Sequence, residues 1–389
     1  RLFIRWRWVR RLWRVFRRCA LPVMGFIFVE MSMKKKVNTL TFHGVLNHGA
    51  ILQAYALQKF LVNNGYQSEL VNYKPLYFMW QIFRPAKSIK KTLLKYKRIK
   101  KFKNFSDNHL QITKKMFFSK KDIEKNLDYC DVIICGSDQI WNKNLTGGSV
   151  DAVFLQKYKH SAKKIAYAAS AGANILSGDP EACKALSEFH ALGIRESHLA
   201  YDVSKMEDVI EPFLVVDPTL LLGKMSYHDI CHSKLVPREK FIVSYEVGTD
   251  ETRRHYDLFV SKIKNSLGLP VFHIGDKPIS SADRNLLNIS PSDWVSFFDS
   301  CEVVVTNSFH GTAFGVNFRK PLFVVSHCDE SKNVRLESFL KKVGMDQCLL
   351  SLADRFDEGV VAELLQNREY TDFNDYVDGS KRFLLESLT

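Results

Sequence analysis

The hydrophobic pattern alternates between short apolar runs rich in β-branched residues and longer segments whose apolar residues recur with helical spacing. Short continuous apolar runs are typical of strands buried in a parallel sheet, and apolar positions three and four residues apart are typical of helices that cover its faces. The pattern predicts strands at residues 34–42, 68–73, 129–136, 164–169, 193–196, 213–216, 241–245, 271–274, 303–306 and 322–325. The chain is therefore expected to belong to the α/β class.

Helices are predicted between these strands. The clearest one covers residues 50–63 and ends at Asn64-Gly65, a typical helix stop. Further helices are predicted at 181–192, 252–267, 292–300, 333–343 and 360–388, and one or two surface helices within 76–121. The alternation in two halves predicts two Rossmann-like doubly wound domains that face a ligand cleft. The expected division is 1–32 as a basic leader, 33–210 and 211–350 as the two domains, and 351–389 as C-terminal helices.

Positive charge is concentrated in two segments of the 389-residue chain. Residues 1–30 hold eight arginines and one glutamate, and residues 84–121 hold fourteen Lys/Arg and one aspartate. These segments carry net charges of +7 and +13, so the remaining residues are at −6 within a formal total of +14. The basicity therefore does not belong to the folded body, and no nucleic-acid partner is expected. Lys90–Lys103 could cradle an acidic acceptor, although a charge run is more often a solvated face.

Residues 1–30 differ in character from the rest. Residues 1–20 place apolar side chains on one helical stripe and arginines on the other, which is typical of a helix lying on an anionic membrane. The apolar run 19–29 that follows is too short to span a bilayer. Because Met31 and Met33 stand just before the first predicted strand, two interpretations stay open: sequence extraneous to the native fold, or a membrane-surface anchor. A cleavable signal peptide is disfavoured.

The spacing of the cysteines and the absence of several known motifs limit the reaction classes that the sequence supports. The eight cysteines are scattered without a C-x-x-C pair, which indicates reduced thiols in a cytoplasmic protein and neither a disulfide framework nor a zinc site. The sequence contains no H-E-x-x-H, P-loop or G-x-S-x-G motif, which disfavours metal-dependent hydrolysis, ATP hydrolysis and serine esterase chemistry. We therefore expect no metal and no cofactor.

The most informative segment is Val303–Val325, which reads as a strand–turn–helix–strand unit. Its turn carries Asn307, Ser308 and His310, and the predicted helix opens at Gly311 and Thr312. The first N–H groups of a helix lack intrahelical partners and can bind an anion. A histidine beside such a helix start, at the end of a buried strand, is a candidate catalytic residue. The alternative is a histidine that only hydrogen-bonds nearby backbone.

Other strand ends carry candidate ligands. The glycine-bounded loop after the first strand offers Asn47, His48 and Gly49 as amide, imidazole and backbone groups, although a loop histidine is usually only solvated. The turn after residues 129–136 offers Asp138, with Trp141 either as a stacking platform or as a core residue.

Two charged residues follow later strands. Arg195, in the stretch GIRES, is a candidate clamp for an anion, and a salt bridge to Glu196 is the alternative. Asp217, in the stretch Asp-Pro-Thr, is interpreted as part of a structural turn rather than as a catalytic residue.

Four stretches together resemble the polysaccharide pyruvyl transferase family: TFHGVLNHGAILQAYALQKFL, DVIICGSDQIWN with KKIAYAASAG, GIRES with VVDPTLLL, and VVVTNSFHGTAFGVNFRKP. The resemblance covers about residues 34–350 and implies a two-domain GT-B-like fold. It also implies transfer of pyruvate as a ketal from phosphoenolpyruvate, the donor substrate, to hydroxyls of a cell-surface glycan or its lipid-linked precursor. The expected location is the cytoplasm, at the inner face of the membrane where the acceptor is lipid-linked.

The resemblance also implies residue roles. His310 matches the family's motif histidine and is expected to act as the acid/base. The helix start at Gly311 and Thr312 is expected to hold phosphate oxygens, and Arg195 to clamp an anionic group. Members of the family commonly have an arginine two residues before the histidine, where this chain has Ser308. A serine cannot replace a bidentate cation, so either Arg195, Arg319 or Arg335 takes over, or the donor differs.

Two other functions remain in play at the level of sequence. A GT-B-like glycosyltransferase with a nucleotide-sugar donor would have the same domain layout. A non-enzymatic protein that binds an anionic membrane or nucleic acid would use residues 1–30 and 84–121. The polar strand ends lie outside both basic segments, which favours the transferase, and peripheral membrane association is compatible with it.

Overall fold

The computed structural model describes residues 34–85, 88–351 and 371–389. Residues 36–389 form one compact unit, and all the described strands and helices belong to it. The predictions for residues 1–30, and for the helix before residue 371, lie outside the described residues.

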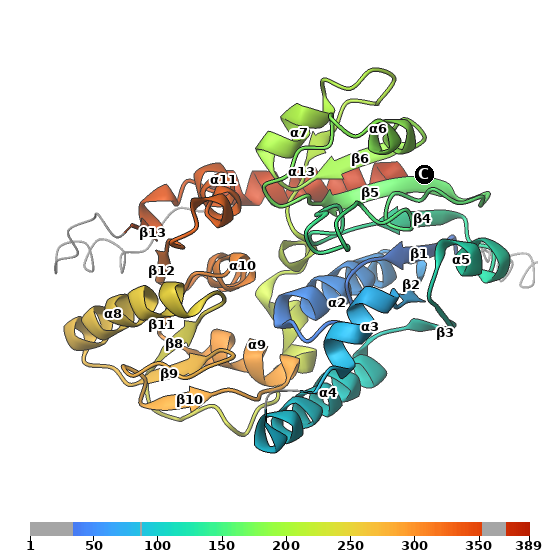
Figure 1. Ribbon diagram of the computed structural model, residues 1–389. Helices are drawn as coiled ribbons and strands as arrows, with labels where there is room; N and C mark the ends of the chain where they lie inside the picture. Colours follow the sequence, from blue (N-terminus) through green and yellow to red (C-terminus); the bar gives the residue numbers. More distant parts are fainter. Residues whose placement is uncertain (1–33, 86–87, 352–370) are drawn as a thin grey trace, which may run out of the picture. The chain divides into compact units, whose positions relative to one another are not determined.

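Seven parallel strands form the first sheet, in the order β3-β2-β1-β4-β5-β6-β7 (Figure 1). They are β1 (Lys36–Leu40), β2 (Gln67–Tyr73), β3 (Ile112–Phe117), β4 (Val132–Cys135), β5 (Lys163–Ala169), β6 (Ala191–Ile194) and β7 (Phe213–Leu214). The helices of this half are α2 (His48–Asn63), α3 (Leu76–Phe83), α4 (Ile89–His109), α5 (Lys120–Asn126), α6 (Pro180–Leu186) and α7 (Ser197–Val203). The strand order reverses between β1 and β4, and such a reversal opens a crevice at the carboxyl ends of the two strands.

Six parallel strands form the second sheet, in the order β10-β9-β8-β11-β12-β13. They are β8 (Ile242–Tyr245), β9 (Val271–Ile274), β10 (Arg284–Leu286), β11 (Val303–Thr306), β12 (Leu322–Val325) and β13 (Leu349–Leu350). Its helices are α8 (Asp250–Leu267), α9 (Pro291–Ser300), α10 (Phe309–Asn317) and α11 (Val334–Lys342). Strands β8 and β11 are buried at every position, as their continuous apolar runs predict. They also flank the reversal of this sheet.

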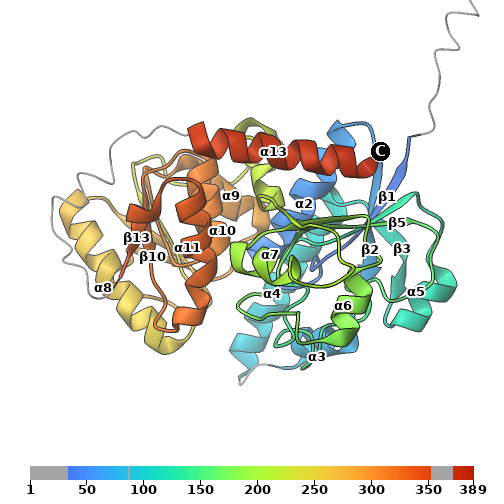
Figure 2. The same ribbon diagram turned by 90° about the horizontal axis from the view of Figure 1, so that it is seen from above.

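The last helix, α13 (Thr371–Leu388), returns to the first sheet (Figure 2). The N–H of Val216 donates a hydrogen bond to the Ser380 hydroxyl oxygen at 3.0 Å. Phe383 stacks on Phe213 with 5.1 Å between ring centroids. The chain therefore closes on the half from which it started. Among the described residues, no helix combines the length and the apolar character needed to cross a bilayer.

Several element predictions need correction. Residues 76–121 contain the edge strand β3 as well as helices, and its exposed Lys114 and Lys115 hide the strand from an apolar-pattern search. The predicted helix 181–192 is too long, because α6 ends at Leu186 and β6 begins at Ala191.

Two helices begin earlier than predicted. The Asn47 side chain accepts a hydrogen bond from the N–H of Ala50 at 3.2 Å and caps α2, so that His48 and Gly49 belong to its first turn. Helix α10 begins at Phe309, which places His310 in the first turn rather than before the helix.

Three buried histidines favour the neutral form. Burial lowers the pKa of His43 and of His273 to about 4, and burial with repulsion from Arg98 lowers the pKa of His48 to about 3. Because a histidine in an unfolded chain titrates near about pH 6.5, the unfolded state takes up protons first as the pH falls. The contribution of these neutral histidines to the free energy of unfolding is thus fully present above about pH 6.5. It is lost as the pH falls from there through their folded-state pKa values of about 4 and 3.

We expect His48→Phe to flatten this pH dependence. Removing one group that protonates only on unfolding should reduce the slope of unfolding free energy by up to about 1.4 kcal/mol per pH unit between about pH 4 and 6. Urea denaturation over a pH series measures the slope. Parent and variant should have the same slope above about pH 7, where histidine is neutral in both states. Equal slopes in the acid range would contradict the prediction.

Candidate functional site

A cavity of about 470 Å³ lies at the carboxyl ends of the central strands of both sheets. Its walls come from the segments that follow β1, β4 and β5 in the first half and β8, β11 and β12 in the second, and from α11. The polar residues on these walls include Asn47, Asp138, Gln139, Asn142, Asn307, Ser308, His310, His327, Lys332 and Arg335. The cavity thus lies at the reversal point of each sheet, where ligands of such folds bind.

His310 lies on the cavity wall, and a buried carboxylate lies next to its imidazole ring. Its Nε2 is 3.6 Å from Oδ2 of Asp217, which ends the segment leading out of β7. Nε2 is buried and makes no hydrogen bond to any described residue. While Nε2 faces Asp217, Nδ1 lies on the side of α2, next to Gly49.

Asp217 is fully buried and has several polar partners. Its Oδ2 accepts hydrogen bonds from Nη1 of Arg195 at 2.8 Å and from the Ser137 hydroxyl at 3.1 Å. Its Oδ1 accepts from the N–H of Thr219 at 3.0 Å and from the Thr219 hydroxyl at 2.8 Å. Burial alone raises the pKa of Asp217, but the charges of His310 and Arg195 and these hydrogen bonds outweigh it and hold the pKa below its usual range. Asp217 is therefore ionised beside the imidazole.

Arg195 lies behind this carboxylate. Its Nε donates to Glu196 at 3.0 Å, its Nη1 donates to Asp217, and its guanidinium carbon lies 4.4 Å from the centre of the Phe309 ring. Although burial alone lowers the pKa of Arg195, the two carboxylates raise it. The side chain is not among those that line the cavity. The Glu196 salt bridge considered from sequence is present, and Arg195 as an anion clamp stays a prediction.

Gly49 fixes the distance between α2 and the imidazole. A Cβ at this position would lie 2.1 Å from Nδ1 of His310, so only glycine fits. Gly311 has the same function on the other side, because a Cβ there would lie 2.3 Å from Oγ1 of Thr306. Neither glycine lines the cavity. Because they have no side chain, the backbone of α2 and of α10 can come close enough to hold His310 where it lies.

Arg335, on α11, places a second guanidinium on the cavity wall. In the amide orientation that satisfies its neighbours, the Gln139 side-chain oxygen accepts from Nη1 of Arg335 at 3.0 Å and from Nη2 at 3.3 Å. Among the described residues, no carboxylate lies within ion-pairing distance of it. Burial and repulsion from Arg195 lower the pKa of Arg335. An arginine stays protonated nevertheless, so the cavity contains a cation that a ligand anion would stabilise.

Asn307 orders the cavity wall through its side chain and backbone. Its side-chain oxygen accepts from the N–H of Val247 at 2.8 Å, and its amide nitrogen donates to the Val247 carbonyl at 3.0 Å. Its backbone carbonyl lies 2.8 Å from Nε2 of His327. Asn307 therefore ties the ends of β8, β11 and β12 together, and its side chain is already engaged.

The predicted site residues fall into two groups. Asn47, Asp138, Asn307, Ser308 and His310 line the cavity. The stacking role of Trp141 is wrong, because its ring is fully buried and its indole N–H donates to the Phe154 carbonyl at 3.1 Å.

His48 and Thr312 also need correction as predicted cavity ligands. His48 lies among Phe102, Tyr245 and Trp294, with its Nε2 3.3 Å from the Ile289 carbonyl. Its imidazole therefore packs between the two halves. Thr312 donates from both its N–H and its hydroxyl to the Ser308 carbonyl.

Several residues of the site were not assigned to it from sequence, among them Asp217, Gln139, Asn142, His327 and Lys332. Asp217 was interpreted as a turn residue, and it does cap the short helix Pro218–Leu220. The available signal was a carboxylate at the end of a predicted strand, the same signal that identified Asp138. Gln139 was passed over because an uncharged amide beside Asp138 has no distinctive pattern.

Two facing Rossmann-like sheets with a cavity between them define a GT-B-like fold. A UDP-GlcNAc 2-epimerase from Methanocaldococcus jannaschii has a TM-score of 0.52 at 8% identity, over 91% of this chain and 99% of that chain. Arabidopsis thaliana UGT89C1 complexed with UDP-L-rhamnose has a TM-score of 0.50 at 11% identity, over 92% and 100%. At such identity the likeness concerns the fold alone.

The sequence itself identifies the family. The profile of polysaccharide pyruvyl transferases matches residues 47–329, and the chain belongs to this family. The match includes strands of both sheets and the cavity residues from Asn47 to Asp329, whereas β1, β13 and Arg335 lie outside it. A search among curated proteins finds no match.

We expect Gly49→Ala to destabilise the protein. The added Cβ must displace His310 or α2, and such overpacking costs about 1–3 kcal/mol. Urea denaturation at neutral pH measures the change. Gly379→Ala, at a half-buried position of α13 with open space around the added methyl group, is the matched control and should stabilise by about 0.5–1 kcal/mol. A stabilising effect of Gly49→Ala would contradict the close approach.

Proposed function

We propose that the protein transfers a pyruvyl group from phosphoenolpyruvate to two hydroxyls of a saccharide that belongs to a cell-surface glycan or its precursor. Family membership supports the reaction class. The observation that carries the proposal is the pairing of His310, backed by ionised Asp217, with an arginine that has no carboxylate partner among the described residues. An acid/base and a site for a small polyanion are what the reaction requires.

Arg335 is the cation that replaces the family arginine missing at Ser308. Of the three arginines weighed from sequence, Arg195 is engaged by two carboxylates, and Arg319 is exposed at the far end of α10. Arg335 lines the same cavity as Ser308 and His310, and Lys332 lies one turn before it. A guanidinium binds phosphate or carboxylate with two parallel hydrogen bonds. The first N–H groups of α10 add donors that have no partner within the helix.

In the proposed reaction His310 transfers the protons. A proton adds to the methylene carbon of the donor, which becomes a methyl group, and a sugar hydroxyl attacks the neighbouring carbon. The bond from that carbon to the phosphate oxygen then breaks, and the second hydroxyl closes the ketal. One hydroxyl proton replaces the proton used for the methyl group, and the other leaves with phosphate. Asp217 stabilises the imidazolium form between these transfers.

We expect Arg335→Gln to weaken phosphoenolpyruvate binding by about 10–100-fold, because a charge-assisted bidentate contact is worth about 1.5–3 kcal/mol. Isothermal titration with phosphoenolpyruvate measures the dissociation constant. Arg319→Gln removes the same charge outside the cavity and should leave it unchanged. His310→Gln should retain binding and lose release of phosphate in the presence of a glycan acceptor.

The outcome also separates the two enzyme classes. An unchanged dissociation constant for phosphoenolpyruvate in Arg335→Gln would contradict the proposal that Arg335 binds the donor. If UDP or a UDP-sugar raises the melting temperature and phosphoenolpyruvate does not, the chain is a glycosyltransferase, and the pyruvyl transfer proposed here is wrong.

The acceptor's location is suggested by a basic, apolar surface on α3 and α4. Their exposed apolar side chains are Leu76, Trp80, Ile89, Leu93, Leu94 and Tyr96, with Trp80 73% and Ile89 83% exposed. Residues 89–100 contain six lysines and arginines and no acid, so the apolar side chains are interspersed with positive charge.

Helix α4, which carries most of this surface, is anchored beside the cavity. Arg98 donates to the Leu46 carbonyl at 3.0 Å, next to Asn47, and Phe102 and Phe105 are buried in the core. We infer that the surface, called the α3–α4 face, docks on a bilayer rich in anionic lipid, where a lipid-linked acceptor would be found.

We expect the emission of Trp80 to shift to the blue with anionic vesicles. In the full chain with Trp6, Trp8 and Trp13 replaced by Phe, the remaining indoles are Trp80 and the fully buried Trp141 and Trp294. Phosphatidylglycerol vesicles should therefore shift only Trp80, and phosphatidylcholine vesicles should not. Ile89→Ser with Leu93→Ser should weaken vesicle binding by about tenfold or more.

The matched control is Leu258→Ser, at an exposed leucine on α8 outside the α3–α4 face. It should bind vesicles like the parent. Vesicle binding without any shift of Trp80 would assign the association to residues 1–30 and refute the α3–α4 face.

A further inference from the structure

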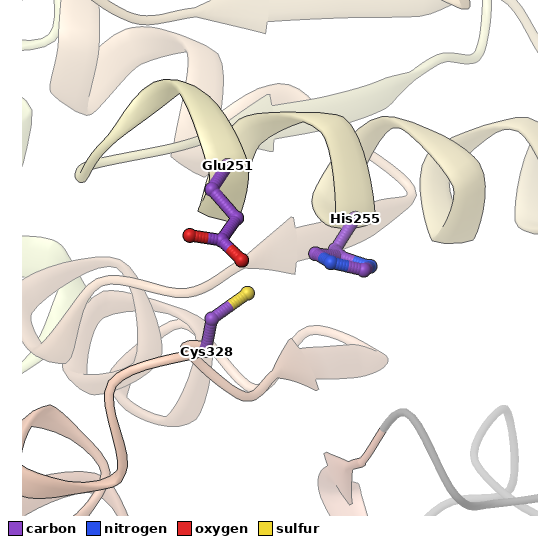
Figure 3. A group of neighbouring side chains, drawn as sticks. All are labelled: Glu251, His255 and Cys328. Carbon is purple, nitrogen blue, oxygen red and sulfur yellow. The ribbon is translucent and has the colours of Figure 1, made fainter.

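Three potential metal ligands gather next to the cavity wall. Glu251 and His255 lie four residues apart on α8 and so share one helix face, and Cys328 directly follows the cavity residue His327 (Figure 3). A carboxylate oxygen, an imidazole nitrogen and the thiol sulfur all lie within 4.8 Å of one another. Residues 73 positions apart in sequence are thus brought together by the packing of α8 beside the segment after β12.

These three side chains are not engaged elsewhere among the described residues. Cys328 is a free thiol, and no hydrogen bond or ion pair from Glu251, His255 or Cys328 to another described residue is present. The neighbouring acid Asp250 differs, because it pairs with Arg253 and Lys277. The three side chains therefore provide three potential metal-ligand atoms that make no hydrogen bond or ion pair with other described residues.

We propose that Glu251, His255 and Cys328 bind one thiophilic divalent cation of the zinc type. Zinc lies about 2.0–2.3 Å from such ligands, so the ligand atoms around one ion are about 3.2–3.8 Å apart. The present ligand atoms lie within 4.8 Å of one another, and side-chain rotations that move them by about 1 Å bring them to the distances that zinc requires. A thiolate and an imidazole select zinc-type ions over magnesium or calcium. On binding, the Cys328 sulfur forms its bond to the ion and releases its proton to the buffer, and water takes the fourth position.

The ion would connect α8 to the wall of the cavity. The segment that carries Cys328 also carries His327 and Lys332 and leads into α11 with Arg335. His327 is itself tied to β11 through the Asn307 carbonyl. Binding at the trio therefore restricts the segment that presents the cations, without adding a group to the cavity itself. The inference stands on these ligands alone and does not depend on the transferred group.

Titration of the full chain, freed of metal by a chelator, with Co²⁺ tests the site directly. The expected result is one bound ion with a sulfur-to-cobalt charge-transfer band, which reports a thiolate ligand, and displacement of the ion by Zn²⁺. Cys328→Ser should abolish the band. Cys183→Ser, at another partly buried free cysteine, should keep it. His255→Gln keeps the thiol and should weaken Co²⁺ binding by about tenfold or more.

Circular dichroism and thermal melting without metal verify that the variants are folded. Absence of the charge-transfer band in the parent, or its persistence in Cys328→Ser, would overturn the proposal. Unchanged Co²⁺ affinity in both His255→Gln and Glu251→Gln would overturn it as well, because the ion would then be held by the thiol alone or by other residues.

Discussion

The charge on the buried carboxylate of Asp217 constrains the whole site. A carboxylate taken out of water must be paired and hydrogen-bonded, and breaking a buried pair costs about 3–5 kcal/mol. The partners of Asp217 come from the end of β4 (Ser137), the end of β6 (Arg195) and the first turn of α10 (His310). The first two belong to one sheet and the third to the other. Satisfying this single charge therefore sets α10 against the carboxyl edge of the first sheet and gives the imidazole its orientation.

Close backbone approach makes that arrangement possible. Gly49 allows α2 to meet the ring of His310, and Gly311 allows α10 to meet Thr306. The Thr306 hydroxyl in turn donates to the Tyr245 carbonyl at 2.7 Å and accepts from the N–H of Ser308 at 3.0 Å. Hydrogen bonds to neighbouring backbone thus fix the turn between β11 and α10. A rigid support of this kind is what a positioned acid/base needs, because small displacements cost much of its effect.

The sequence predicts the strands of the sheet centres well because they are buried on both faces and read as apolar runs. It fails at the edges, where β3 has exposed lysines and β10 has only three residues. For the site, the rule that polar residues follow buried strands leads to Asn47, Asp138, Ser308 and His310, which line the cavity. The same rule cannot tell Trp141 in the core from a ring in the cavity, because both follow β4. Nor can it pair Arg195 with Asp217, whose contact depends on how β6 and β7 lie side by side.

The two arginines near the imidazole illustrate why residue type does not determine role. The guanidinium of Arg195 already donates to two carboxylates, so an incoming anion would meet a group whose positive charge is largely neutralised. Arg335 meets only the neutral oxygen of Gln139, which fixes its orientation and leaves its charge uncompensated by any ion pair among the described residues. One arginine therefore holds the carboxylate that orients His310, and the other is available to a ligand. Arg335 therefore places a cation on the cavity wall from α11, whereas the turn before α10 contributes the uncharged Ser308.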